Sequence, residues 1–165
     1  MNLGFLKLIG ARAISFVSTL AVSLAIVGSL PKFKERRQRY FADAAATGSV
    51  ARLQFLHLAG ANINAHSQLP SPLALAAGEG KLNAVRYLLD EGADINLCGG
   101  DGNTALTEAA FYEHLPVVKE LLGRGANVNG LSVNGTALDI ALTKKNPALI
   151  DLLQHYGAKR SSDVR

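Results

Sequence analysis

Two kinds of short apolar segment alternate along residues 40–160. Segments of the first kind begin with a Ser or Thr, which can cap a helix by accepting a hydrogen bond from an otherwise unpaired backbone N–H. Segments of the second kind carry apolar residues at helical spacing. The pattern therefore predicts an all-α chain of paired short helices. The first helices open at Ser71, Thr104 and Thr136, and the second cover 84–89, 117–122 and 149–153.

A five-residue segment returns at a constant interval after the helix pairs. Gly92–Asn96 reads Gly-Ala-Asp-Ile-Asn, and related segments lie 32 positions earlier at Gly60–Asn64 and 33 positions later at Gly125–Asn129. Gly157–Arg160 is a faded copy. So constant a period indicates an internal repeat. A glycine at this place can adopt the left-handed conformation that ends a helix, so we expect each copy to stop the second helix of its unit.

Each unit resembles an ankyrin repeat, a family whose pattern joins Thr-Pro-Leu-His, Leu-Ala-Ala, a glycine, Val-Val-x-Leu-Leu and Gly-Ala-Asp-Val-Asn. The best matches are Ser71–Asn96 and Thr104–Asn129. The resemblance implies an ankyrin-repeat solenoid of helix-turn-helix units with short β-turn or hairpin loops. Outer copies are degenerate, as expected for units that face water on one side. The expected units are 40–66, 67–98, 99–131 and 132–160, followed by a tail at 161–165.

This chain departs from the family pattern at two places in the unit. The opening histidine is replaced by Ala74, Thr107 and Asp139, so the hydrogen bonds implied for it must be absent or replaced. The glycine after the first helix becomes Glu113 and Lys145 in the last two units. A left-handed backbone at a non-glycine residue costs on the order of 1 kcal/mol. We therefore expect the C-terminal half to be the looser half, and Glu113→Gly to raise the melting temperature.

An uncharged segment, residues 13–30, precedes the repeats. As a helix it would span roughly 27 Å, just enough for the hydrocarbon core of a bilayer. Five basic residues follow between Lys32 and Arg39, and by the positive-inside rule they place the following domain in the cytoplasm. We therefore expect a short N-terminal segment at 1–12, a transmembrane or signal-anchor helix at 13–30, and a basic juxtamembrane linker at 31–39 beside the lipid headgroups. The alternative for the linker is the first turn of a helix.

Two other interpretations of residues 13–30 stay open. Ser23–Ala25 offers small residues at the cleavage spacing of a signal peptide, which would make the protein periplasmic or secreted. The segment could also be a helix that packs on the repeat domain. Ala21, Ala25 and Ser29 form a row of small residues that would allow a weak homodimer through this helix.

The positive charge of the chain is concentrated at its N-terminus. Residues 1–39 carry seven basic residues and one acid, a net charge of +6, whereas the remainder carries ten basic and twelve acidic residues, a net charge of −2. The repeat region therefore has no basic character that would favour nucleic acid. Cys98 is the single cysteine, so no intrachain disulfide can form.

No catalytic or metal-binding spacing is evident in the sequence. The histidines fall in different units, without a second His or a Cys at ligand spacing. His114 matches a family position that helps to join the two helices of a unit. Gly99–Gly102 is typical of a turn and lacks the strand and helix that flank a phosphate-binding loop. We expect neither a cofactor nor catalysis, although a site formed only in three dimensions stays a further alternative.

The resemblance implies that a protein partner binds the concave groove formed by the loop tips and the ends of the first helices. Phe111 and Tyr112 are the main candidates, because aromatic anchors in apolar patches dominate binding energy. Leu131 and Val133 would extend this patch. The alternatives are that Phe111 packs into the neighbouring unit and that Leu131 and Val133 are buried beneath the hairpin. The other candidates are Glu79, Lys144, His66, Gln68, Leu69, Cys98, Asp101 and Asn134.

The sequence predicts a membrane-tethered interaction module that acts by occlusion or scaffolding. Tethering would raise the effective concentration of partners in the same membrane. The alternative is an exported binding protein from which about the first 25 residues have been removed. The identity of the partner is not encoded in the repeat pattern, because a fold implies no particular function.

Overall fold

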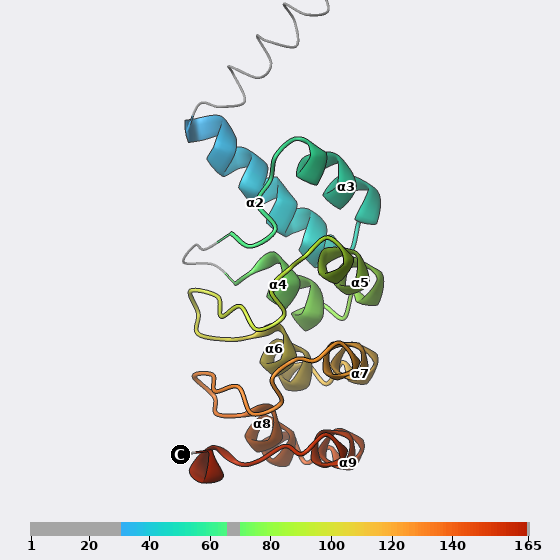
Figure 1. Cartoon of the computed structure of the whole chain (residues 1–165), viewed down its shortest axis with the longest axis vertical. Coiled ribbons are helices and arrows are strands. Elements are labelled where there is room, and N and C mark those ends of the chain that lie inside the picture. The colour runs from blue at the N-terminus through green and yellow to red at the C-terminus, as the bar shows by residue number, and fades with distance from the viewer. Residues whose placement is uncertain (1–30, 66–69, 165) are drawn as a thin grey trace, which may run out of the picture. The chain divides into compact units, whose positions relative to one another are not determined.

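Pairs of short helices stack on one another in residues 38–65 and 70–164 (Figure 1). The computed structural model describes residues 31–65 and 70–164. The chain divides into two units, residues 1–37 and 38–165, and each is described by itself. The expected hydrophobic helix at 13–30 lies outside the described residues. None of the helices in the described part is both long and apolar enough to cross a membrane.

The expected all-α architecture is confirmed for the described residues. In the stack, α4, α6 and α8 lie in one column, α3, α5, α7 and α9 lie in a second column, and the loops project from the side of the first column (Figure 1). Among the described residues, the expected hairpin loops are represented by one isolated antiparallel bridge, between Ser132 and Gly135. The helices are α2 (Pro31–Thr47), α3 (Val50–Leu58), α4 (Pro72–Gly78), α5 (Leu82–Asp90), α6 (Ala105–Phe111), α7 (Leu115–Gly123), α8 (Ala137–Lys144) and α9 (Pro147–His155), with a 3₁₀ turn, η1, at Ser161–Asp163.

Residues 31–39, expected as a linker, are helical. They form the N-terminal half of α2, which begins at Pro31 and continues to Thr47. Proline is well suited to the first helical position, because its missing N–H would be unpaired there anyway. The Lys, Arg, Gln and Glu residues that follow are good helix formers. Residues 31–39 therefore form the first part of a helix, which was the alternative to a linker.

Small residues fill the space between the two columns of helices. Ala76, Ala77, Ala109 and Ala110 on the first helices are all fully buried. Larger apolar residues of the second helices complete this core, among them Leu53, Leu88, Leu121 and Leu153, each with no exposed surface. Alanine keeps the first helices thin, so that the neighbouring units can approach closely.

The three expected N-caps are confirmed. Ser71 Oγ accepts a hydrogen bond from Ala74 N at 3.1 Å. Thr104 and Thr136 both form capping boxes, in which the partner side chains are Thr107 and Asp139. A capping box pairs two otherwise orphan backbone donors. Two of the three residues that replace the family's opening histidine therefore act within their own helix N-terminus.

The last asparagine of the repeated segment joins each unit to the next. Asn64 Oδ1 accepts a hydrogen bond from Asp94 N at 2.8 Å, and Asn96 Oδ1 accepts one from Asn127 N at the same distance. Asn129 Oδ1 likewise accepts from Lys159 N at 2.7 Å. We call this set the asparagine ladder. It supplies contacts between units at the place where the left-handed glycines end the second helices.

The left-handed turns predicted from the repeated glycines are confirmed. Gly92 has φ of +86°, and the equivalent glycines of the other units have similar values. Glu113 and Lys145 also adopt left-handed conformations, with φ of +60° and +56°. Both non-glycine residues therefore have the left-handed backbone that we expected to be strained.

Lys145→Gly is expected to stabilise the stack by about 0.5 kcal/mol, because relief of left-handed strain exceeds the extra flexibility gained by the unfolded chain. For a domain of this size that corresponds to a rise of about 2 °C in melting temperature. Glu113→Gly should give a smaller rise, since it also removes the hydrogen bond from Asn146 Nδ2 to Glu113 at 2.7 Å. Thermal unfolding followed by circular dichroism measures both, and no rise for Lys145→Gly would contradict the strain.

The end of the chain is fastened to the last repeat. Asp139 Oδ2 accepts hydrogen bonds from Thr136 N at 3.0 Å and from Ser161 N at 2.9 Å. Thr136 Oγ1 also donates to Lys159 O at 2.9 Å. Residues 161–163, expected as part of a tail, form η1 and thus close the N-terminus of α8. We call Asp139 and its donors the terminal clamp.

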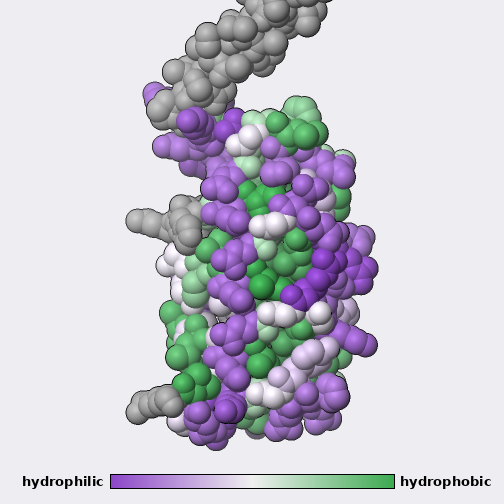
Figure 2. Space-filling model, viewed as in Figure 1, coloured by the Kyte–Doolittle hydropathy of each residue, from purple (hydrophilic) through white to green (hydrophobic). Residues whose placement is uncertain are grey.

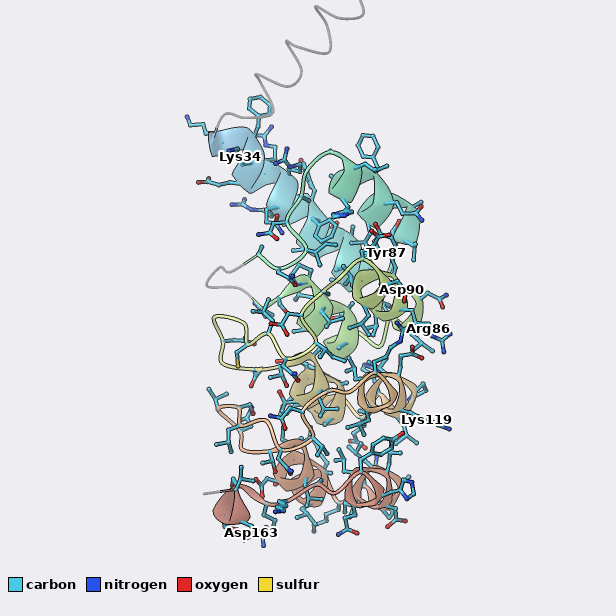
Figure 3. The ribbon with its side chains drawn as sticks, viewed as in Figure 1. Lys34, Arg86, Tyr87, Asp90, Lys119 and Asp163 are labelled. Atoms are coloured by element: carbon cyan, nitrogen blue, oxygen red, sulfur yellow. The ribbon has the colours of Figure 1, made fainter. Side chains whose placement is uncertain are left out.

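A row of ion pairs joins α5 and α7 on the side away from the loops. Arg86 Nε lies 2.9 Å from Glu120 Oε2, and Arg124 lies 3.1 Å from Glu120 and 2.6 Å from Asp90. Figure 3 shows Arg86, Asp90 and Lys119 projecting from this side. The hydrogen bond from Arg86 is the main cause of the lowered pKa of Glu120. Exposed pairs of this kind contribute little stability individually.

Candidate functional site

The aromatic pair at the end of α6 lies on the surface. Phe111 is 38% exposed and Tyr112 is 56% exposed. Their rings meet edge to face, with centroids 5.1 Å apart. The Nζ atom of Lys144, at the end of α8, lies 4.1 Å from the centre of the Phe111 ring. Helix ends from two successive units therefore bring three of the predicted residues together.

Leu131 and Val133 are exposed, so the alternative that buries them beneath the hairpin is wrong. Their exposed fractions are 56% and 71%. Val133 nevertheless contacts the preceding loop tip, because a Cβ atom placed on Gly102 would lie 2.8 Å from Val133 Cγ1. Figure 2 shows hydrophobic surface on the loop side of the stack, near the loop between α7 and α8. The predicted apolar extension of the groove is thus accessible.

The structure describes four of the remaining candidates. Glu79 is exposed at the end of α4, and Cys98 is an exposed free thiol in the loop that follows α5. Asp101 is half-buried and Asn134 is exposed. His66, Gln68 and Leu69 lie outside the described residues.

A small polar pocket opens beside the aromatic pair. Its volume is about 160 Å³, and α6 supplies most of its wall. The loop before α6 and the loop before α8 close its two other sides. The lining residues are Asn103, Thr107, Glu108, Phe111, Tyr112 and Asn134. We call it the α6 pocket.

Asn103 and Glu108 were not predicted as site residues. Glu108 is the single charged residue in the alanine-rich first helix of its unit. This isolated charge could have identified Glu108 as a site residue from the sequence. Asn103 Nδ2 donates hydrogen bonds to Glu108 Oε1 at 2.8 Å and to Asp101 Oδ2 at 3.2 Å. Two carboxylates therefore share one amide group at the rim of the pocket.

The carboxyl group of Glu108 ionises less readily than a free one. Burial is the main cause of its raised pKa, and the nearby charge of Asp101 adds to the effect. The hydrogen bond from Asn103 acts in the opposite direction. Among the described residues, no basic side chain forms an ion pair with Glu108. The negative charge of the pocket is therefore incompletely compensated.

His114 fastens α7 to the preceding unit. Its Nε2 atom hydrogen-bonds with the carbonyl oxygen of Gly78 at 2.9 Å. Its ring also lies against Gly80, where an added Cβ atom would come within 2.7 Å of Nδ1. His114 is therefore structural, but it joins neighbouring units, whereas the family resemblance implied a link between the helices of one unit.

In the part of the chain that the structure describes, no three His, Cys, Asp or Glu side chains are grouped as they would be around a metal ion. The α6 pocket is also small compared with the roughly 300–1,000 Å³ that ligand and cofactor sites typically occupy. It contains a carboxylate, amides and a buried threonine, but no nucleophile paired with a base. The arrangement is suited to recognition of a side chain or a backbone segment.

Comparison with known proteins identifies a family pattern described as ankyrin repeats (3 copies), which matches residues 41–132. Over 118 residues the chain is 36% identical to the ankyrin repeat and KH domain-containing protein mask-1 of Caenorhabditis elegans, covering 70% of this chain and 4% of the relative. Over 61 residues it is 39% identical to the putative ankyrin repeat protein YahD of Escherichia coli K12, covering 37% of this chain and 30% of the relative.

An enzyme is also among the relatives. The chain is 31% identical over 116 residues to an L-asparaginase of Dirofilaria immitis, covering 68% of this chain but 20% of that protein. The chain therefore spans less than a third of each of these three relatives. Each similarity is confined to a part of the relative and carries no activity across.

Proposed function

This chain belongs to the ankyrin repeat family, whose repeats are protein–protein interaction modules. We propose that it binds a protein partner along the groove beside α4, α6 and α8. The observation that carries the proposal is the exposed aromatic pair Phe111–Tyr112 beside Leu131 and Val133. Large apolar side chains gathered on one surface mark interaction sites. The proposed mechanism is occlusion or scaffolding of the partner, without bond chemistry.

The rigidity of the stack supports this proposal. The alanines beneath the pair, Ala109 and Ala110, are fully buried, and the helix ends with Tyr112 N donating to Glu108 O at 3.1 Å. The aromatic side chains are thus presented from a fixed backbone. Because the groove is already ordered before binding, little conformational entropy of this chain is lost when a partner binds. This small entropic cost favours affinity.

We also propose that the module is tethered to a membrane, with the repeats on its cytoplasmic face. Support comes from the sequence, in the uncharged residues 13–30 and the basic residues between Lys32 and Arg39. A row of small residues in the same segment would allow a weak homodimer. The alternative is export after removal of a signal peptide. Sequencing of the natural N-terminus separates the two, since a start near Ile26 would exclude the anchor.

Replacement of both Phe111 and Tyr112 by Ala is expected to weaken partner binding about 30-fold or more. An aromatic anchor at the centre of an interface typically contributes 2 kcal/mol or more, and 1.4 kcal/mol corresponds to a tenfold change. The partner would first be captured from native membranes by the full-length chain, and its affinity for purified variants would then be measured.

Phe55→Ala provides the matched control. Phe55 is 72% exposed, but it lies on α3, in the column of second helices away from the groove. Its replacement should leave the affinity unchanged. Equal affinity of the wild type and the double variant would reject the groove as the binding surface.

A further inference from the structure

The α6 pocket has unused hydrogen-bond acceptors. Glu108 Oε1 is occupied by Asn103 Nδ2, but Oε2 accepts no hydrogen bond from the described residues. Asn103 Oδ1 is buried and also has no donor in the described part of the chain. An unpaired buried acceptor is costly, and the cost is recovered when a ligand supplies a donor. Both atoms belong to residues that line the same pocket.

The aromatic ring of Tyr112 lies beside the Oε2 carboxylate oxygen of Glu108. A Cβ atom placed on Gly78 would lie 3.3 Å from Glu108 Oε2 and 3.5 Å from Tyr112 Cδ2, so the carboxylate and the ring are neighbours over the end of α4. Tyr112 is 56% exposed, so its ring is accessible to a ligand. A planar cation can stack on such a ring while it donates hydrogen bonds to the adjacent acceptors.

The charge of the site also favours a cation. Asp101 and Glu108 bring two carboxylates to one amide, whereas Lys144 contributes one ammonium group, over the ring of Phe111. The carboxylates thus outnumber the ammonium group. A volume of about 160 Å³ corresponds to a few water molecules at roughly 30 Å³ each. That space suits a single side chain.

We propose that the α6 pocket receives an arginine side chain of the partner protein, with the guanidinium group held by Glu108 and stacked on Tyr112. Arginine is favoured over lysine because its fork of five N–H donors can reach several acceptors at once, and its plane matches an aromatic ring. The proposal rests on the proposed function, and it adds the chemistry that the partner must present.

The test uses the full-length ¹⁵N-labelled chain and three capped pentapeptides with two glycines on each side of a central residue. The central residue is arginine, lysine or citrulline, which keeps the shape of arginine but has no charge. Amide chemical shifts are followed at low ionic strength, where screening is weak. The arginine peptide should shift the amides of Asn103, Glu108, Tyr112 and Asn134, and the other two peptides should bind more weakly.

Glu108→Gln is the decisive variant, because it removes the charge while its side-chain oxygen can still accept the hydrogen bond from Asn103. It should weaken binding of the arginine peptide at least tenfold. Glu91→Gln is the control, since Glu91 lies beside His57 at the end of α5. Unchanged binding by Glu108→Gln, equal affinity for the lysine peptide, or the same shifts produced by Ca²⁺ alone would each overturn the proposal.

The two proposals fail in different ways. If partner capture is lost in the Phe111 and Tyr112 double variant but is unchanged in Glu108→Gln, the arginine pocket is wrong and the groove stands. If partner capture survives the double variant, the groove assignment fails. The response to the arginine peptide then still decides, by itself, whether the pocket binds a guanidinium group.

Discussion

Leu88→Ala is expected to lower the free energy of unfolding by about 3 kcal/mol. Leu88 has no exposed surface and lies in α5, which contacts both α3 and α7. Removal of a buried leucine side chain loses its transfer free energy and leaves a cavity, which together typically cost 2–5 kcal/mol. Because each unit of a repeat stack is stabilised by its neighbours, a weakened second unit also loosens its contacts on both sides. Urea denaturation followed by circular dichroism at 222 nm measures the change.

Leu58→Ala is the control for this prediction. It removes the same atoms from a leucine that is 87% exposed at the end of α3. A surface substitution of this kind should change stability by no more than about 0.5 kcal/mol. If the two variants lost equal stability, Leu88 would not be a core residue.

Asp139→Asn is expected to destabilise the protein at neutral pH by about 2 kcal/mol. Burial of the Asp139 carboxyl opposes its ionisation, but backbone N–H groups of Thr136 and Ser161 outweigh burial and lower the pKa from 3.8 to about 2. Each unit of this difference corresponds to about 1.4 kcal/mol. The side chain is 18% exposed, so screening by solvent is limited.

The pH dependence follows from the direction of this shift. Because the folded-state pKa is below the unfolded-state value, the contribution of Asp139 is fully present above about pH 4. It is lost as the pH falls towards 2. The difference in unfolding free energy between wild type and Asp139→Asn should therefore shrink from about 2 kcal/mol at pH 7 to about 0.4 kcal/mol at pH 2. A difference that is constant with pH would show that the terminal clamp does not depend on charge.

Asp151→Asn serves as the matched control. Asp151 is an exposed residue of α9, and its side chain has no hydrogen bond or ion pair among the described residues. The substitution should leave stability within about 0.5 kcal/mol of the wild type at neutral pH.

Features that depend on near neighbours in the chain were predictable from the sequence. The caps at Ser71, Thr104 and Thr136 require only a hydroxyl and a backbone N–H three residues later. Left-handed turns follow from a glycine at the end of a helix. Even the strained turn at Lys145 was deduced by comparing one repeat with the next.

The α6 pocket could not be predicted in the same way. Asn103 and Glu108 are only five residues apart, but the pocket also requires Asn134, from the next unit, to close the other side. The position of Asn134 is set by the stacking of whole units, which local rules do not describe. Exposure of Val133 has the same origin, since it depends on how closely one loop tip approaches Gly102 in the preceding one.

The asparagine ladder makes the chain extensible. Each complete copy of the repeated segment offers an amide oxygen towards one neighbour and a backbone N–H towards the other, as Asn96 Oδ1 and Asp94 N do in the central copy. A duplicated unit inserted in register would find a complementary group at both of its ends. Gene duplication can therefore lengthen the recognition surface in steps of one whole unit, whereas an insertion of any other length would leave these groups unmatched.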